Sequence, residues 1–301
     1  MKTTHKRAIC VIVAALIILI GCGAVKLDKQ KPSRSIVTAQ GTICPLSDVQ
    51  ALLEKTVQDI NRDDQCDNLI LFVHGRGKHP GKAFRQKLLT DLESNYSARV
   101  IMFHWPSWEG ALAFPEQAAR ASADDFISVL TALKTFKDNH ADLTRNVKFT
   151  LLTQSMGSLV LEESILRLQD ESPQGLFDTL VISAPASYTK DHAQWVNQMD
   201  LSEHIYILFN RDDPILGSAG IREMGRRLGK GLKSRGEAVE LSDHATYIDA
   251  TNIFLLHRYY LHRNLKWAPA LKHFFDEVLN GLPATLDSDS HIVQIHKQQT
   301  S

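Results

Sequence analysis

Short apolar runs alternate along the chain with longer segments whose apolar residues recur at helical spacing. The runs are rich in Val, Ile, Leu and Phe, and we predict strands at 68–73, 99–103, 147–152, 180–183, 205–209 and 245–250. The longer segments predict helices at 82–92, 115–137, 157–169, 221–232 and 268–279. Strands that alternate with helices form a mostly parallel sheet. The pattern therefore predicts an α/β fold with a doubly wound sheet flanked by helices.

The first residues have the pattern of an export signal. Lys2, Lys6 and Arg7 precede an apolar run over residues 8–20 that is too short to span a bilayer comfortably. The run ends in Leu19-Ile20-Gly21-Cys22, which resembles a bacterial lipobox. This resemblance implies cleavage before Cys22 and acylation of that residue. An uncleaved anchor and a plain signal peptide are the alternatives.

We therefore expect a lipoprotein-type signal peptide over 1–21, a polar tether over 22–40, one α/β domain over 41–283 and a flexible tail over 284–301. Acyl chains on Cys22 would hold the domain at a membrane. Gly23 rather than Asp follows that cysteine, which by resemblance to sorting rules implies the outer membrane of a bacterial cell envelope, facing the periplasm. The 34 basic and 34 acidic residues balance, so the composition does not favour nucleic acid as a partner.

A serine lies where one predicted strand passes into a predicted helix. The sequence there is Thr153-Gln154-Ser155-Met156-Gly157, close to the Gly-x-Ser-x-Gly of a nucleophile elbow. A sharp turn of this kind lifts the serine hydroxyl out of the sheet and directs the helix N-terminus towards it. Thr153 occupies the first small position and would need a slightly opened turn. Ser155 is the candidate nucleophile, and a serine that caps an ordinary helix is the alternative.

The loop His74-Gly75-Arg76-Gly77 directly follows the predicted strand 68–73. In enzymes with such an elbow, a loop at this place supplies the second backbone N–H of the oxyanion hole, and glycines let the main chain approach the substrate. The donors would be the N–H groups of Arg76 and Met156. A plain turn that closes a buried strand is the alternative.

Five short blocks occur in one order along the chain: Phe72-Val73-His74-Gly75, Phe103-His104-Trp105-Pro106-Ser107, Gln154-Ser155-Met156-Gly157, Asn210-Arg211-Asp212-Asp213 and His257-Arg258-Tyr259-Tyr260. In these blocks the chain resembles the α/β-hydrolase superfamily, in particular a bacterial branch with VHG, FxWPS, HSMG, SRND and HSY blocks. The resemblance spans roughly residues 68–279 and implies the α/β-hydrolase fold. Gln154 replaces the common histidine beside the serine, and Thr153 replaces a small residue.

The superfamily's order of catalytic residues is nucleophile, acid, histidine. The match to its fourth block implies Asp213 as the acid, with Asp212 as the second choice, and loop aspartates that cap a turn are the alternative. For the histidine, the last block implies His257, which falls after the predicted strand 245–250. His244 is the alternative if the last strand lies earlier in the chain.

The residues together predict a membrane-anchored serine hydrolase, of the esterase or lipase type, with a Ser-His-Asp triad and an acyl-enzyme intermediate. The substrate would be a small-molecule or lipid acyl compound, and we expect no cofactor and no metal. An inactive, lipid-anchored binding or scaffold protein is the main alternative, suggested by Thr153 and Gln154. A metallohydrolase that uses His74 with His79, or His257 with His262, lacks an HExxH-type pair.

Two further groups of residues have open assignments. Aromatic and apolar residues could line an acyl pocket, form a lid or simply pack, namely Trp105, Trp108, Leu112 and Phe114. Of the four cysteines, Cys10 leaves with the signal and Cys22 would carry lipid. Cys44 and Cys66 are expected either to form a disulfide in an oxidising envelope or to stay as two thiols.

Overall fold

The computed structural model describes residues 34–77, 82–110, 113–216, 226–234, 236–253, 257–286 and 290–295. All of them belong to one compact unit, Ser33–Ser301. The export signal, the lipobox and most of the expected tether lie outside these residues, as does Leu112. Within the described ranges no helix combines the length and apolar character that a membrane span requires.

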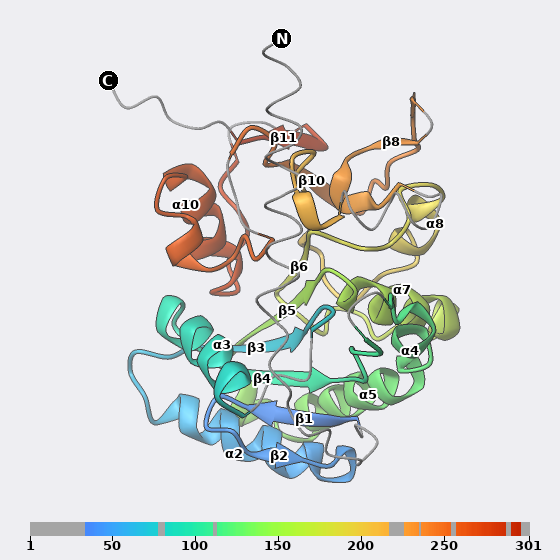
Figure 1. The fold of residues 1–301 in the computed structure, drawn as a ribbon. Helices are drawn as coiled ribbons and strands as arrows, with labels where there is room; N and C mark the ends of the chain where they lie inside the picture. The colour runs from blue at the N-terminus through green and yellow to red at the C-terminus, as the bar shows by residue number, and fades with distance from the viewer. Residues whose placement is uncertain are drawn as a thin grey trace. The chain divides into compact units, whose positions relative to one another are not determined.

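A sheet of nine strands runs through the middle of the unit in the order β2-β1-β4-β3-β5-β6-β7-β10-β11 (Figure 1). The bounds are β1 (Ser35–Thr38), β2 (Ile43–Cys44), β3 (Asn68–Val73), β4 (Ala98–His104), β5 (Lys148–Gln154), β6 (Thr179–Ser183), β7 (Ile205–Phe209), β10 (Ala245–Asp249) and β11 (Ile292–Gln294). Strands from β4 across to β11 pair in parallel, and β1 pairs antiparallel with both β4 and β2. A separate hairpin joins β8 (Lys233–Ser234) to β9 (Glu237–Ala238). The six predicted strands and the parallel, doubly wound sheet are confirmed.

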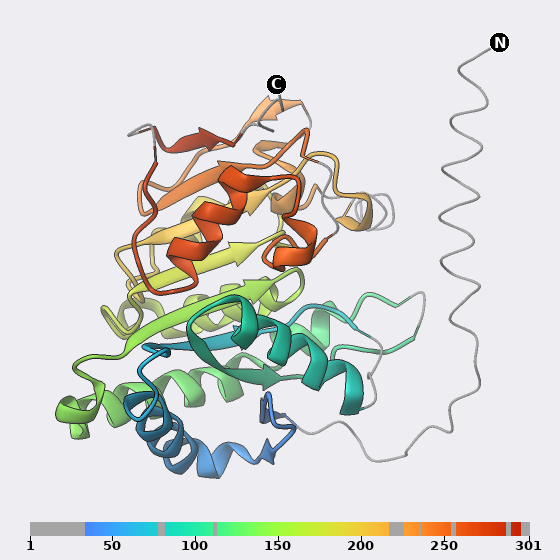
Figure 2. The ribbon, with the colours of Figure 1, turned by 90° about the vertical axis from the view of Figure 1, so that its left-hand side faces the viewer.

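Helices cover both faces of the sheet, α3 and α10 on one face and α5 and α7 on the other (Figures 1 and 2). The helices are α2 (Val49–Asn61), α3 (Lys82–Asn95), α4 (Glu116–Arg120), α5 (Ala123–Asn139), α6 (Ala141–Thr144), α7 (Gly157–Leu168), α8 (His192–Val196) and α10 (Pro269–Val278). Every residue of β3, β6 and β7 is buried. Strands covered on both faces read as continuous apolar runs, which is why the sequence revealed them.

Two helix predictions need correction. The segment 115–137 is two helices, α4 and α5, because the hydroxyl of Ser122 between them bonds to the carbonyl of Ala118 at 2.7 Å and competes with the helical pattern. The described part of 221–232 is not an α-helix: Arg227 forms a bridge with Tyr188, and Leu228–Lys230 is a short 3-10 turn. Helices α2, α6 and α8 were not predicted.

The predicted domain boundaries are too narrow at both ends. Strand β1 lies inside the range assigned to the tether and pairs with β4, with all four of its residues buried. Strand β11 lies inside the range assigned to the tail and pairs with β10. Both strands are short and lie within stretches of mostly polar sequence, so the average composition of those ranges gave no sign of a strand.

The disulfide alternative for Cys44 and Cys66 is wrong, because both are free and buried thiols. Cys44 is in β2 at the sheet's outer edge, whereas Cys66 precedes β3, and β1 and β4 lie between these two strands. Three strand spacings amount to roughly 14 Å, well beyond the 7 Å or so between Cα atoms that a disulfide allows. Burial raises the pKa of both thiols.

Candidate active site

Ser155 stands at a sharp turn between β5 and α7, as the sequence predicted. Its φ is +53°, in the left-handed region that costs energy for residues with a side chain. Two hydrogen bonds hold this turn: the Ser155 N–H donates to the carbonyl of Ser183 at 3.0 Å, and its own carbonyl accepts from Ala186 N–H at 3.1 Å. Thr153 is fully buried in β5, so a β-branched residue at this position is compatible with the turn.

Two glycines allow the backbone around Ser155 to pack very closely. A Cβ added to Gly157 would lie 2.3 Å from the carbonyl oxygen of Val73, so α7 touches the end of β3 directly. A Cβ added to Gly75 would lie 2.7 Å from the Cβ of Ser155. The loop after β3 therefore passes immediately beside the serine, where the second oxyanion donor was predicted.

The predicted oxyanion donors are the amides of Arg76 and Met156, which directly follow Gly75 and Ser155 in the chain. Met156 is the N-cap of α7, and the first N–H groups of a helix have no acceptor within the helix. Arg76 follows Gly75, whose own N–H donates to the side-chain oxygen of Gln154 at 3.2 Å. Gln154, one of the two residues that depart from the expected blocks, thus binds the loop that carries Arg76. Sequence reasoning had found the departure but not this contact.

Asp213 follows β7 and is fully buried, and its carboxylate accepts four hydrogen bonds. Oδ1 accepts from the backbone N–H groups of Ile215 at 2.9 Å and Leu216 at 3.2 Å. Oδ2 accepts from His257 Nδ1 at 2.7 Å and from the Tyr259 hydroxyl. Burial alone would raise the pKa of Asp213, but His257, Tyr259 and the backbone donor at Leu216 hold it below its usual value.

The contact with Asp213 fixes how His257 can act. An ionised carboxylate only accepts hydrogen bonds, so Nδ1 of His257 is the donor, and in the neutral imidazole Nε2 then carries the lone pair. The side chain keeps 17% of its surface exposed, which leaves it accessible from the carboxyl edge of the sheet. A histidine in this state can take a proton from a nearby hydroxyl.

The alternative residues lie elsewhere. Asp212 is on the surface, where its carboxylate accepts the N–H of Asn252 at 3.2 Å. His244 comes directly before β10 and borders a hollow with Glu203 and His204, which precede β7, so it lies at the amino edge of the sheet. The structure therefore joins His257 to Asp213 and places His244 at the opposite edge.

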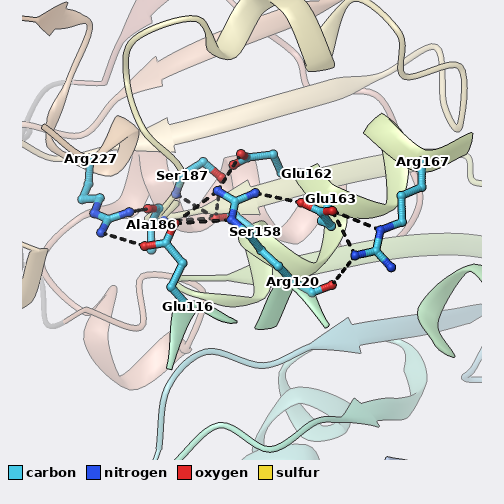
Figure 3. A network of polar contacts seen from close by, with 9 residues as sticks. All are labelled: Glu116, Arg120, Ser158, Glu162, Glu163, Arg167, Ala186, Ser187 and Arg227. Carbon is cyan, nitrogen blue, oxygen red and sulfur yellow. Dashed lines mark hydrogen bonds and ion pairs between the residues drawn. The ribbon is translucent and has the colours of Figure 1, made fainter. Parts of the chain in front are cut away.

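A network of polar contacts joins helix α7, which follows the Ser155 turn, to the loop after β6 (Figure 3). The hydroxyl of Ser158, three residues after the candidate nucleophile, accepts from Ala186 N–H and Ser187 N–H, both at 3.1 Å, and from the Ser187 hydroxyl at 2.9 Å. Arg227 is fully buried and donates to the carbonyl of Ala186 at 2.8 Å. The loop after β6 is thus fastened both to α7 and to Arg227.

The same network extends along α7 through charged side chains (Figure 3). Arg227 pairs with Glu116 at 3.4 Å, and Arg120 pairs with Glu116 at 3.2 Å and Glu162 at 3.0 Å. Arg120 also contacts Glu163, which pairs with Arg167. Glu116 with Arg120, and Glu163 with Arg167, are pairs four residues apart within one helix. The contacts that join Arg120 to α7 and Arg227 to Glu116 link residues far apart in the sequence, so the pattern of charges alone gave no signal for the network.

The described aromatic residues after β4 pack against neighbouring backbone and side chains. Trp105 is fully buried, and its ring N–H donates to the carbonyl of His74 at 2.7 Å. Trp108 lies beneath the guanidinium of Arg76, and Phe114 lies beneath that of Arg227. Beside this cluster, a small cavity of about 40 Å³ is lined by Gly75, Arg76 and Gln154 and by the apolar residues Phe72, Leu88 and Met102.

The residues named in the metallohydrolase alternative have other partners. His262 Nε2 contacts Asp276 at 2.7 Å, and His74 Nε2 contacts His104 at 3.1 Å. His79 lies outside the described residues. In the parts of the chain that the structure describes, no three His, Cys, Asp or Glu residues are grouped as metal ligands would be.

The profile of a family described as alpha/beta hydrolase of unknown function (DUF900) matches residues 49–265, most of the chain. The chain belongs to this family. A search of curated proteins gives no match. Among solved structures, the chain is similar to carboxyl esterase 2 of the fungus Tuber melanosporum, with 14% identity, 87% of this chain and 90% of that chain covered, and a TM-score of 0.42.

The chain is also similar to two other solved structures, an α/β serine hydrolase without lid from Xanthomonas campestris and an esterase from Pyrobaculum calidifontis. For the first, the identity is 16%, the match covers 72% of this chain and 84% of the Xanthomonas chain, and the TM-score is 0.37. For the second, the identity is 12%, the match covers 88% of this chain and 97% of the Pyrobaculum chain, and the TM-score is 0.39. The family match and the strand order together identify the fold as that of an α/β hydrolase.

Proposed function

We propose that this α/β hydrolase is a membrane-anchored serine hydrolase that cleaves an ester or a related acyl substrate. The observation that carries the proposal is the hydrogen bond of 2.7 Å between His257 and the buried Asp213, at the sheet edge where Ser155 occupies a turn with φ of +53°. A serine in a strained turn, and an imidazole oriented by a buried carboxylate after another strand of the same sheet, are the groups that nucleophilic catalysis needs.

The reaction follows from the roles of these groups. Nε2 of His257 takes the proton of the Ser155 hydroxyl while Oγ attacks the carbonyl carbon, and the carbonyl oxygen becomes an oxyanion that the amides of Arg76 and Met156 stabilise. The imidazolium, stabilised by Asp213, then gives its proton to the leaving alcohol as the acyl-enzyme forms. Water, deprotonated by the same imidazole, releases the acid and restores the serine.

The small cavity beside the loop after β3 supports an uncharged acyl substrate. Its lining includes the apolar side chains of Phe72, Leu88 and Met102 next to Arg76, whose amide is a predicted oxyanion donor. The fold itself hosts many reactions, so these residues are a better guide to the substrate than the architecture.

For the location we propose that Cys22 carries the acyl chains and that the domain faces the periplasm from a bacterial outer membrane. The support is the sequence alone: a basic start, an apolar run over 8–20, a lipobox-like end and Gly23. Growth with radiolabelled fatty acid should label the wild type and not Cys22→Ser, and label in both proteins would contradict this anchor.

Hydrolysis of p-nitrophenyl esters tests the proposed activity. We expect turnover of at least one of the acetyl, butyryl and long-chain esters in the wild type, with losses of at least a thousandfold in Ser155→Ala and His257→Ala. His244→Ala is the matched control and should keep full activity. A folded wild type without turnover of any ester would favour the binding or scaffold role, and loss in His244→Ala alone would contradict the assignment of the base.

A further inference from the structure

Tyr259 makes a contact with the candidate acid that the proposed mechanism does not use. Its hydroxyl donates to Oδ2 of Asp213, the same oxygen that accepts the N–H of His257. The tyrosine is fully buried, and burial together with the charge of Asp213 raises its pKa well above the usual value, so it remains a neutral donor. Sequence reasoning had included Tyr259 only as part of a family block.

The Asp213 carboxylate depends on its donors because none of its surface reaches water. The backbone N–H groups of Ile215 and Leu216 donate to Oδ1, and the side chains of His257 and Tyr259 donate to Oδ2. A buried carboxylate stays ionised only when hydrogen bonds replace its lost hydration. Without Tyr259, Oδ2 would have His257 as its remaining donor.

Other charged groups near Asp213 contact its backbone or point away from its carboxylate. Lys230 donates to the backbone carbonyl of Asp213 at 3.0 Å. Asp212 accepts from Asn252, and Arg211 pairs with Asp249 at 3.1 Å. Of the described side chains, His257 and Tyr259 are those that donate to the carboxylate oxygens of Asp213.

We propose that Tyr259 is a positioning residue of this site: its hydroxyl fixes the orientation of the Asp213 carboxylate and keeps it ionised while His257 gains and loses its proton. The inference rests on the proposed function, because it assigns Tyr259 a part in the same catalytic cycle. The hydroxyl shares Oδ2 with the imidazole, so it also holds the carboxylate plane in the orientation that His257 requires.

The neighbouring residue offers a matched control. Tyr260 is also fully buried, and its hydroxyl has no hydrogen-bond partner among the described residues. Tyr259→Phe and Tyr260→Phe therefore each remove one buried hydroxyl and leave the ring, but only the first removes a bond to Asp213.

The first test compares ester hydrolysis in the two variants. Tyr259→Phe should lower kcat about tenfold with little change in KM, because the lost bond acts on the base and not on substrate binding. Tyr260→Phe should keep the wild-type kcat. In an Asp213→Asn background, Tyr259→Phe should have no further effect, since its role runs through Asp213. Equal kcat in the two phenylalanine variants, or a full additional loss in that background, would overturn the proposal.

The second test needs no turnover and separates this inference from the proposed function. The ¹³Cγ signal of Asp213, assigned by its loss in Asp213→Asn, reports protonation as the pH falls. We expect its change to begin at a higher pH in Tyr259→Phe than in the wild type, and at the wild-type pH in Tyr260→Phe. If Ser155 has no hydrolytic role but this signal shifts, the proposed function fails and the contact's effect on Asp213 stands. The same onset of change in all three proteins would overturn the role of Tyr259.

Discussion

Replacing Gly157 by alanine tests how closely the elbow helix packs against the sheet. The new Cβ would lie 2.3 Å from the carbonyl oxygen of Val73 and 2.9 Å from its carbonyl carbon. An ordinary contact would require a separation larger by about 1 Å, and the atoms in the way are backbone in the middle of the sheet. Helix α7 would have to move, against the hydrogen bonds that fix Ser155 and Ser158.

We expect Gly157→Ala to lower the free energy of unfolding by about 3 kcal/mol, the upper part of the range for overpacked interiors. The displaced helix would also move the Met156 amide, and losing one oxyanion donor lowers kcat by about a hundredfold or more. Urea denaturation and ester hydrolysis measure the two effects. Gly77→Ala is the stability control, because nothing lies within 4 Å of its added Cβ. Wild-type stability and rate in Gly157→Ala would refute the close packing of α7 on β3.

Three further predictions concern the surroundings of the site. Gln154→Ala removes the acceptor of the Gly75 N–H and should lower kcat about tenfold with a steady KM, whereas an unchanged kcat would separate Gln154 from the oxyanion loop. Arg227→Met removes the buried donor to the Ala186 carbonyl and one of the two arginines that pair with Glu116, and it should cost about 3 kcal/mol in urea denaturation. Arg145→Met, in an exposed pair, should change stability by less than about 0.5 kcal/mol, and equal effects of the two substitutions would contradict the role of the network. The pKa of Asp213 is lower in the folded protein than in the unfolded chain, so its ionised carboxylate stabilises the fold fully above about pH 5. This stabilisation is lost as the pH falls through the folded pKa. The difference in free energy of unfolding between wild type and Asp213→Asn should therefore shrink in acid, as urea denaturation at several pH values would show.

The sequence predicted the parts of the fold that have a strong local pattern. Strands β3 and β7 were located to the residue because buried parallel strands are continuous apolar runs bounded by polar loops. The Ser155 turn was recognised because its glycine spacing reflects a close backbone contact, now visible between Gly157 and Val73. By contrast, β1 has only four residues in a polar stretch, and its pairing with β4 depends on contacts that are distant in the sequence.

In the candidate site, too, the residues in short sequence blocks were predicted and the contacts between distant residues were not. His257 and Asp213 were named from short blocks, but their hydrogen bond joins residues 44 positions apart and required the structure. The role of Tyr259 depends on the direction of one hydroxyl, and the bond from Gly75 to Gln154 depends on the approach of two loops. The disulfide prediction failed because the spacing of Cys44 and Cys66 carries no information on the strands that separate them.

Covalent labelling tests the central claim, that Ser155 is an activated nucleophile. A fluorophosphonate probe reacts with serines that a neighbouring base activates, and mass spectrometry of the digested protein locates the adduct. We predict one adduct, on the peptide that contains Ser155, absent in Ser155→Ala and strongly reduced in His257→Ala. A folded wild-type protein that stays unlabelled, or an adduct that persists in Ser155→Ala, would contradict the account.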